Sequence, residues 1–233
     1  MKRGVSKAQR RSPVTARRSA AKAKNDGLLI LTIGHSTRPI DEFLALLQAH
    51  GVTRLVDVRT VPRSRHNPQF GQDHLPASLK AAGIAYEHQP SLGGLRRTSA
   101  DSPNQGWRNL SFRGYADYMQ TTEFQDAVEH LIEQARGGEH LVLMCAEAVP
   151  WRCHRSLIAD ALLVRGVASE DIRTLTQTMP HRLTPFARVR GTRITYPSDD
   201  AQPANAATTS NVGAARPRAA TRSPTNRKRG KVT

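Results

Sequence analysis

Short runs of apolar residues alternate along this chain with apolar stripes at helical spacing. Residues 28–33 are almost continuously apolar, and such a run is typical of a strand buried on both faces. Ile40, Phe43 and Leu47 then repeat on one face of a predicted helix. A buried strand followed by an amphipathic helix predicts the first unit of an α/β domain.

The same alternation continues to about residue 197 and predicts the rest of the fold. Further strands are expected at residues 54–58, 84–88, 140–144, 171–175 and 193–196. Further helices are expected at residues 74–82, 111–120, 122–136 and 153–165, and Thr122 with Gln125 has the spacing of a capping box. Because strands and helices alternate, we expect a three-layer α/β domain, with a mostly parallel sheet of about five strands and helices on both faces.

Charge divides the chain into three segments. The formal net charge is +16, and residues 1–26 hold nine Lys/Arg and one acid, while residues 198–233 hold seven Lys/Arg and two acids. Neither end segment contains an aromatic residue, so each has little apolar surface to offset the entropy lost on ordering. We therefore predict disordered basic tails at 1–26 and 198–233 around a single domain at 27–197.

The cysteines and the lack of long apolar runs bear on the compartment. Cys145 and Cys153 are the two cysteines of the chain, too few for the disulfide framework of a secreted protein. No apolar run approaches the roughly 20 residues that span a bilayer. The N-terminus lacks the hydrophobic region of a secretory signal, although its Arg-rich, acid-poor composition is also that of organelle transit peptides. We expect a cytoplasmic protein with no membrane partner.

The basic residues of both tails also suggest a macromolecular partner, because such arms often contact nucleic acid. The candidate residues are Arg10, Arg11, Arg17, Arg18, Arg227, Lys228 and Arg229. Contacts between these residues and phosphates would make binding strongly dependent on salt. The alternative is that the tails only keep the protein in solution.

Polar and reactive residues gather just after the predicted strands. In open α/β sheets ligands bind outside the carboxyl ends of the strands, so we expect these residues at one edge of the sheet. The catalytic candidates are Cys145, Glu147, Cys153 and His35, and the ligand-binding candidates are Gly34, Ser36, Asp57, Arg59, His154 and Arg155. The pattern predicts a site for a small-molecule ligand, identifies no cofactor and assigns no metal.

Several of these residues belong to short motifs in a fixed order. The motifs are Ile33-Gly34-His35-Ser36, Asp57-Val58-Arg59, Pro62 with Ser64, Leu92-Gly93-Gly94, Cys145-Ala146-Glu147 and Cys153-His154-Arg155. In these motifs the chain resembles, from about residue 31 to 176, the bacterial family catalogued as domain of unknown function 488. The resemblance implies an α/β fold and implies no particular reaction.

The cysteines carry the strongest chemical signal. Cys153 is expected near the start of a helix, where the helix dipole and two neighbouring arginines favour a thiolate. That thiolate would act as a nucleophile with His154 or His35 as base, or Glu147 would be the general base. In the alternative, both cysteines are small buried apolar side chains and Glu147 pairs with an arginine.

Three familiar cysteine motifs do not fit the spacing. A Cys-x5-Arg loop is excluded because six residues separate Cys145 from Arg152, and a Cys-x-x-Cys redox motif is excluded because seven residues separate the two cysteines. Cys145-Ala146-Glu147 matches the first half of a zinc deaminase signature, but the second half is absent. A zinc site formed by Cys145, Cys153, His154 and His35 would need adjacent Cys and His ligands on one tetrahedral ion, an awkward arrangement.

Other features suit an anionic ligand. The backbone N–H groups of residues 34–36 are expected at a helix start, where anions bind. Asp57 either contacts a ribose or forms a salt bridge with Arg59 that shapes the site. Loop arginines can bind phosphates and two aromatic residues can stack on a base, the alternative being a solvated basic face with aromatic residues packed in the loops. These residues are Arg59, Arg63, Arg65, Arg96, Arg97, Arg108 and Arg113, with Trp107 and Phe70.

The sequence is compatible with three functions. The first is an enzyme acting on a phosphate- or nucleobase-containing substrate at the carboxyl edge of the sheet, with Arg59 and Arg155 as anion-binding residues. The second is a non-catalytic module that associates with nucleic acid through the basic tails. The third is a sensor domain that binds a small ligand.

Overall fold

The structure is a computed structural model that describes residue 25 and residues 27–198. The tails predicted at 1–26 and 198–233 therefore lie almost wholly outside the described residues. The same holds for every residue proposed to contact nucleic acid, from Arg10 to Arg229.

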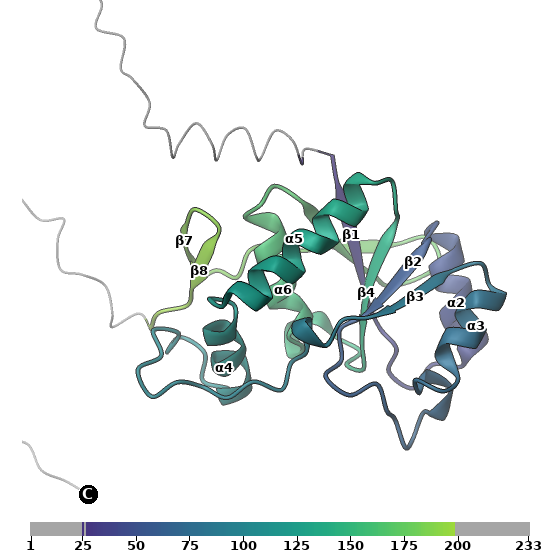
Figure 1. Ribbon diagram of the computed structural model, residues 1–233, viewed down its shortest axis with the longest axis horizontal. Helices are drawn as coiled ribbons and strands as arrows, with labels where there is room; N and C mark the ends of the chain where they lie inside the picture. Colours follow the sequence, from purple (N-terminus) through teal and green to yellow (C-terminus); the bar gives the residue numbers. More distant parts are fainter. Residues whose placement is uncertain (1–24, 26, 199–233) are drawn as a thin grey trace, which may run out of the picture. The chain divides into compact units, whose positions relative to one another are not determined.

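A six-stranded sheet forms the middle layer of the domain (Figure 1). Its strands are β1 (Leu29–Gly34), β2 (Arg54–Asp57), β3 (Ala85–His88), β4 (Leu141–Cys145), β5 (Ala168–Ile172) and β6 (Thr178–Pro180). They lie in the order β3-β2-β4-β1-β5-β6, with β6 antiparallel to β5 and the other pairs parallel. The prediction of a mostly parallel α/β sheet is confirmed.

Helices cover both faces of this sheet. On one face α2 (Ile40–Ala49) and α3 (Leu75–Ala81) pack in a cluster with the strands, and on the other face α4 (Leu110–Tyr118), α5 (Thr122–Arg136) and α6 (Arg155–Leu163) do so. Figure 1 shows these two groups of helices on opposite sides of β1 and β4. Consecutive strand residues alternate between the two clusters, as Val142 and Leu143 do, which explains why the strands have apolar residues at almost every position.

The end of the sheet departs from the prediction. The strand expected at residues 171–175 is β5 at Ala168–Ile172, and the chain then turns, with the Arg173 N–H donating to the Gln177 carbonyl, into β6. The polar sequence of β5 hides the strand, although Ser169 and Asp171 are buried. A second, two-stranded sheet pairs β7 (Arg188–Arg190) with β8 (Arg193–Thr195); β8 was predicted, whereas β6 and β7 were not.

Two helix starts also differ from the prediction. The N-cap of α5 is Thr121, whose Oγ1 accepts a hydrogen bond from the Phe124 N–H, so the capping box expected at Thr122 is wrong. The helix expected to begin at residue 153 begins at Arg155. Short 3-10 helices lie in the connections: η1 (Pro68–Phe70), η2 (Pro90–Leu92) and η3 (Pro150–Arg152). Among the described helices, none is both long and apolar enough to cross a membrane.

Candidate functional site

The connections that follow β1 and β4 diverge to opposite faces of the sheet. Gly34 of β1 pairs with Cys145 of β4, yet the chain leaves β1 toward α2 on one face and leaves β4 toward α6 on the other. Ligand sites in open α/β sheets lie at such switch points, outside the carboxyl ends of the strands. The residues predicted to form a site follow these strands and the neighbouring β2.

A cavity of about 430 Å³ lies at the carboxyl ends of β2 and β4. Of the predicted site residues, Arg59, Cys145, Glu147, Cys153 and His154 line it. Its other lining residues are Thr60, Val61, Arg63, Gly94, Leu95, Asn109, Ser111, Phe112, Ala146 and Arg152. The remaining predicted residues, which are Gly34, His35, Ser36, Asp57 and Arg155, are not part of the lining.

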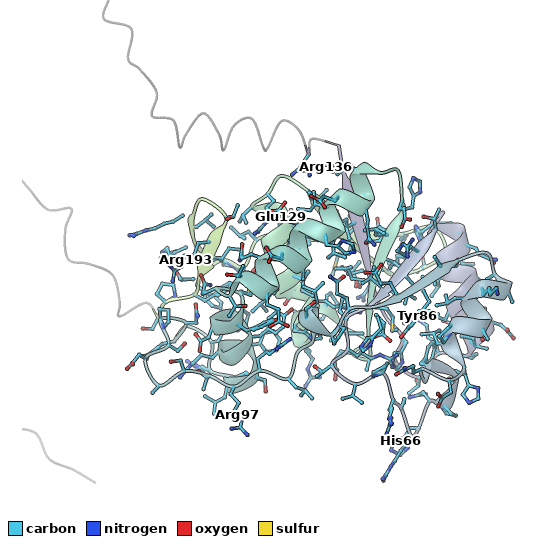
Figure 2. The ribbon with its side chains drawn as sticks, in the orientation of Figure 1. His66, Tyr86, Arg97, Glu129, Arg136 and Arg193 are labelled. Atoms are coloured by element: carbon cyan, nitrogen blue, oxygen red, sulfur yellow. The ribbon has the colours of Figure 1, made fainter. Side chains whose placement is uncertain are left out.

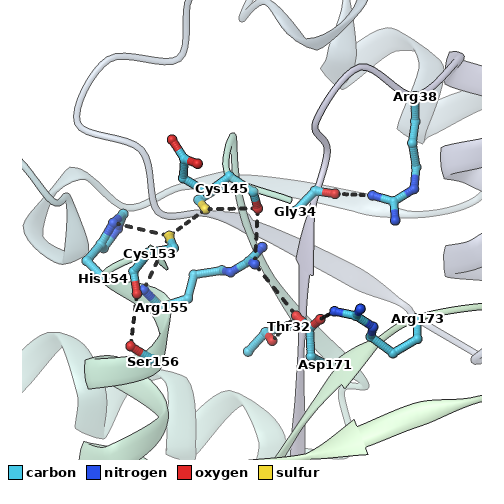
Figure 3. A network of polar contacts seen from close by, with 11 residues as sticks. Thr32, Gly34, Arg38, Cys145, Cys153, His154, Arg155, Ser156, Asp171 and Arg173 are labelled. Atoms are coloured by element: carbon cyan, nitrogen blue, oxygen red, sulfur yellow. Dashed lines mark hydrogen bonds and ion pairs between the residues drawn. The ribbon is translucent and has the colours of Figure 1, made fainter. Parts of the chain in front are cut away.

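Two thiols meet at the wall of this cavity. The Sγ atoms of Cys145 and Cys153 are 2.7 Å apart, and the two residues are 2% and 3% exposed (Figure 3). Cys145 ends β4, and Cys153 lies in the short segment between η3 and α6. That turn brings together two sulfur atoms that the sequence separates by seven residues.

The environments of the two thiols differ. Burial opposes ionisation of Cys145, but the hydrogen bond with Cys153 and the nearby positive charge of Arg155 together place the pKa of Cys145 below its ordinary value. Burial and the neighbouring Cys145 sulfur raise the pKa of Cys153 well above the ordinary value. The thiolate is therefore favoured at Cys145 and not, as the sequence suggested, at Cys153.

His154 is a neutral base beside these thiols. Its Nε2 is 3.0 Å from the Val58 carbonyl, which can only accept, so Nε2 carries the proton and Nδ1 presents a lone pair to Cys153 Sγ at 3.6 Å. Burial lowers the pKa of His154 to about 4, so the ring is neutral near pH 7. A Cβ at Gly94 would lie 2.5 Å from Nδ1, which explains why the loop contacting His154 has glycine there.

Arg155 is a fully buried cation behind the thiols. Its Nη2 donates to the Glu147 carbonyl at 3.2 Å. The same Nη2 lies 3.6 Å from Oδ1 of Asp171, toward which the guanidinium points (Figure 3). Asp171 also accepts from Thr32 Oγ1 at 2.8 Å. Within the described part of the chain, Nε and Nη1 of Arg155 have no hydrogen-bond partner. The sequence marked Arg155 as an anion-binding residue, but its position makes it a buried charge that favours the Cys145 thiolate.

Asp57 and His35 hold Arg59 on the cavity wall. The Asp57 carboxylate accepts from Arg59 Nε at 2.8 Å and Nη2 at 2.5 Å, and from Tyr86 Oη at 3.0 Å. Arg59 Nη2 also donates to the Phe70 carbonyl at 2.8 Å, and Nη1 lies 3.3 Å from His35 Nε2. Of the two readings of Asp57, the structure matches the salt bridge that shapes the site.

His35 has a supporting position. Its Nδ1 donates to the Ser36 carbonyl at 2.8 Å, its ring stacks on Phe70 with centroids 4.3 Å apart, and it is 2% exposed. Burial lowers the pKa of His35 to about 4, so Nε2 offers a lone pair to Arg59 rather than a proton. The structure therefore places His35 behind Arg59, away from the cavity wall.

The prediction that the backbone N–H groups of residues 34–36 bind an anion is wrong. The N–H groups of His35 and Ser36 donate to the carbonyls of Cys145 and Ala146 at 2.9 and 3.0 Å, which extends the pairing of β1 with β4. The next helix begins only at Ile40. Gly34 instead permits close packing, because a Cβ there would lie 1.8 Å from the Glu147 carbonyl oxygen.

The outer part of the cavity carries exposed charged residues. Glu147, Arg63 and Arg152 are exposed there. Within residues 27–198, no ion pair joins the Glu147 carboxylate to an arginine. The alternative in which Glu147 pairs with an arginine therefore has no support in that range. The opening of the cavity therefore carries side chains of both charges.

Several loop residues expected to bind phosphate or a base make contacts within the protein instead. Arg96 lies over the Tyr118 ring at 3.5 Å and donates to loop carbonyls, and Arg113 donates to the Trp107 carbonyl. Phe70 is fully buried. Trp107 packs against the aromatic residues Phe112, Phe186 and Tyr196. Arg97 remains exposed and points away from the ribbon (Figure 2).

The sequence missed the wall that α4 contributes. Asn109 caps this helix by accepting from the Ser111 N–H at 2.8 Å, and Asn109, Ser111 and Phe112 line the cavity. The available signal was the long loop before α4, because loops of that length are usually functional or mobile. Asp171, which pairs with Arg155, was missed because its strand was misplaced.

In the part of the chain that the structure describes, no group of three or more His, Cys, Asp or Glu side chains is arranged to hold a metal ion.

The profile of one protein family, described as Domain of unknown function DUF488, matches residues 39–162. This range holds α2, β2, β4 and most of α6, and thus the whole cavity lining. No curated protein and no solved structure matches the chain.

Proposed function

This chain belongs to the family described as Domain of unknown function DUF488, and on that premise we propose that it is an enzyme acting on a phosphate- or nucleobase-containing substrate in the cavity, with Cys145 as nucleophile. One observation carries the proposal. The Cys145 sulfur lies 2.7 Å from the Cys153 sulfur on the wall of a cavity that three arginines also line. A thiolate is the reactive form of cysteine, and positive surroundings favour it.

The arginines provide the affinity for an anion. Arg59 uses four of its five guanidinium N–H groups on Asp57, Phe70 and His35. Within the described residues, this leaves one Nη1–H for a ligand. Arg63 and Arg152 are exposed at the opening and are free to turn toward a phosphate. Planar, permanently charged guanidinium groups are well suited to phosphate oxygens.

The other cavity residues provide the proton transfers. The Cys153 sulfur lies 2.7 Å from the Cys145 sulfur, where an S–H group donated by Cys153 would stabilise a Cys145 thiolate, and the lone pair on His154 Nδ1 faces the Cys153 sulfur. The Glu147 carboxylate at the opening is positioned to act as general acid or base toward a bound substrate. Arg155 supports the thiolate from behind the wall through its charge.

The first expected result concerns the reactivity of Cys145. Iodoacetamide should label Cys145 roughly tenfold or more faster than Cys153, because only the thiolate reacts. The rate should rise with pH about a midpoint below that of free cysteine, and Cys153→Ala should move this midpoint upward, because the donated S–H group is lost. Neither His35 nor His154 titrates in this range, since each has a pKa of about 4. Labelling sites are identified by peptide mass spectrometry at each pH.

A faster reaction at Cys153, or a midpoint unchanged by Cys153→Ala, would remove Cys145 from the role of nucleophile. Circular dichroism of the variant shows whether the fold is kept.

The second expected result concerns anion binding. Inorganic phosphate should slow the labelling of Cys145, and the double variant Arg63→Gln with Arg152→Gln should raise the phosphate concentration needed by about tenfold, equivalent to about 1.4 kcal/mol. The matched control is Arg97→Gln with Arg108→Gln, which removes two exposed arginines that do not line the cavity. Equal loss of protection in both double variants would reduce the effect to net charge alone.

The two other functions make different predictions at the same site. A sensor domain would bind its ligand equally well after Cys145→Ser, whereas the enzyme would lose turnover. The nucleic-acid module depends on the tails, which lie outside the described residues, so no contact in residues 27–198 favours it over the enzyme.

A further inference from the structure

The chain has two cysteines in total, and the fold places both sulfur atoms side by side. We infer that Cys145 and Cys153 form a reversible intramolecular disulfide when a hydroperoxide enters the cavity. This goes beyond the proposed function, since it depends on the geometry of the two thiols and not on any substrate. It makes the pair a modification site within the candidate active site.

The geometry requires little movement. The sulfurs are 2.7 Å apart, and a disulfide bond holds them at about 2.05 Å. Cys145 is fixed at the end of β4, between β1 and β2. Cys153 lies between η3 and α6, in a segment that belongs to neither helix. A small rotation of the Cys153 side chain would therefore close the bond without displacing a strand.

Access and polarity suit a small oxidant. Both cysteines line the cavity of about 430 Å³, although each is almost fully buried. A hydroperoxide is small enough to enter, whereas a folded protein is not. The buried charge of Arg155 favours the thiolate that must attack the peroxide, and oxidation follows thiolate character and access.

The two cysteines have complementary roles in the reaction. The Cys145 thiolate attacks the terminal oxygen of the hydroperoxide ROOH, the O–O bond breaks, and RO⁻ takes a proton to leave as ROH. Cys145 is then a sulfenic acid. The Cys153 sulfur attacks the Cys145 sulfur, an S–S bond forms, and hydroxide leaves with a proton as water. In sum two thiols and ROOH give one disulfide, ROH and H2O, with both thiols oxidised and the peroxide reduced.

His154 is placed to assist the second step. Its Nδ1 lone pair is 3.6 Å from Cys153 Sγ, so it can accept the proton as Cys153 becomes the attacking group. The ring is already neutral and oriented, because Nε2 donates to the Val58 carbonyl. A neighbouring thiol that captures the sulfenic acid also keeps Cys145 from irreversible oxidation to the sulfinic acid.

The experiment treats the full chain with hydrogen peroxide and follows intact mass and free thiols. Both thiols should disappear together, with loss of two hydrogen atoms and no added oxygen, and dithiothreitol should restore both. Proteolysis without reductant should yield the peptide pair joined through Cys145 and Cys153. Accumulation of oxygen on Cys145 in the wild-type chain, or a disulfide-linked dimer in place of the internal bond, would overturn the inference.

Two variants assign the roles. In Cys153→Ser the Cys145 sulfenic acid should persist and be trapped by dimedone, whereas the wild-type chain should give little adduct. In Cys145→Ser the remaining thiol should react with peroxide at least tenfold more slowly. Equal peroxide rates for the two single variants would overturn the assignment. The wild-type mass and peptide analysis decides the main point even if a variant fails to fold, and needs no substrate.

Discussion

Gly34→Ala is expected to destabilise the domain by at least about 3 kcal/mol, at the upper end of the usual cost of overpacking. A Cβ at this position would lie 1.8 Å from the Glu147 carbonyl oxygen and 2.7 Å from its carbon. These are backbone atoms of the β4–η3 connection, so they cannot rotate away as a flexible side chain would. Urea unfolding of the wild type and the variant measures the difference in free energy of unfolding.

A matched control separates this clash from the general effect of replacing glycine. Gly137 follows the last residue of α5 and has a φ of −70°. The nearest atom to an added Cβ there would be the Gln134 carbonyl oxygen at 3.1 Å, much farther than the contact at Gly34. Gly137→Ala should change the free energy of unfolding by less than about 1 kcal/mol. If Gly34→Ala changed the free energy of unfolding as little as Gly137→Ala, the end of β1 would not pack closely against the Glu147 backbone. That result would also undermine the position of Arg155, which shares this space.

The sequence predicted the parts of the fold that depend on burial alone. The apolar runs of β1 and β4 are visible because both faces of these strands are covered, and the stripe of α2 is visible because one face is. β5 was not predicted at its observed bounds because it buries the polar residues Ser169 and Asp171. Asp171 accepts from Thr32 and pairs with Arg155, and pairing of this kind between distant segments leaves no periodic signal.

For the candidate site, the sequence predicted which residues share one edge of the sheet but not how their side chains are placed. Residues just after parallel strands must share an edge, so Arg59, Cys145 and Glu147 could be brought together from sequence. Whether a side chain lies on the cavity wall or behind it depends on rotamers and partners. His35 turns from the cavity because Phe70 and Ser36 hold its ring. The contact between the two thiols depends on the 3-10 turn at η3, which the spacing of the cysteines did not reveal.

The site thus has two layers with different chemistry. The inner layer is a set of buried charges, in which Asp57 pairs with Arg59 on the cavity wall and Arg155 lies 3.6 Å from Asp171 behind the thiols. The outer layer is the cavity with its thiols and exposed charges. Buried ion pairs are poor sources of net stability, but breaking one leaves an uncompensated charge. The inner layer therefore sets the position and charge of the groups that the outer layer uses.

Asp57→Asn is the sharpest test of this arrangement. The carboxylate is fully buried and accepts two guanidinium N–H groups of Arg59, which is itself 7% exposed. Removing its charge leaves Arg59 without a counterion, and we expect a loss of about 3 to 5 kcal/mol in the free energy of unfolding. Phosphate should also protect Cys145 from iodoacetamide less well, because Arg59 is no longer held on the cavity wall.

Tyr86→Phe provides the control, since it removes only the Oη hydrogen bond at 3.0 Å to the same carboxylate. It should cost about 1 kcal/mol and leave the protection by phosphate unchanged. Urea unfolding and the labelling assay are run on both variants at the same pH and salt concentration. If Asp57→Asn costs no more than Tyr86→Phe, the pair with Arg59 is open to solvent. If it is costly but leaves protection intact, Arg59 does not contact the anion, and Arg63 and Arg152 account for the binding.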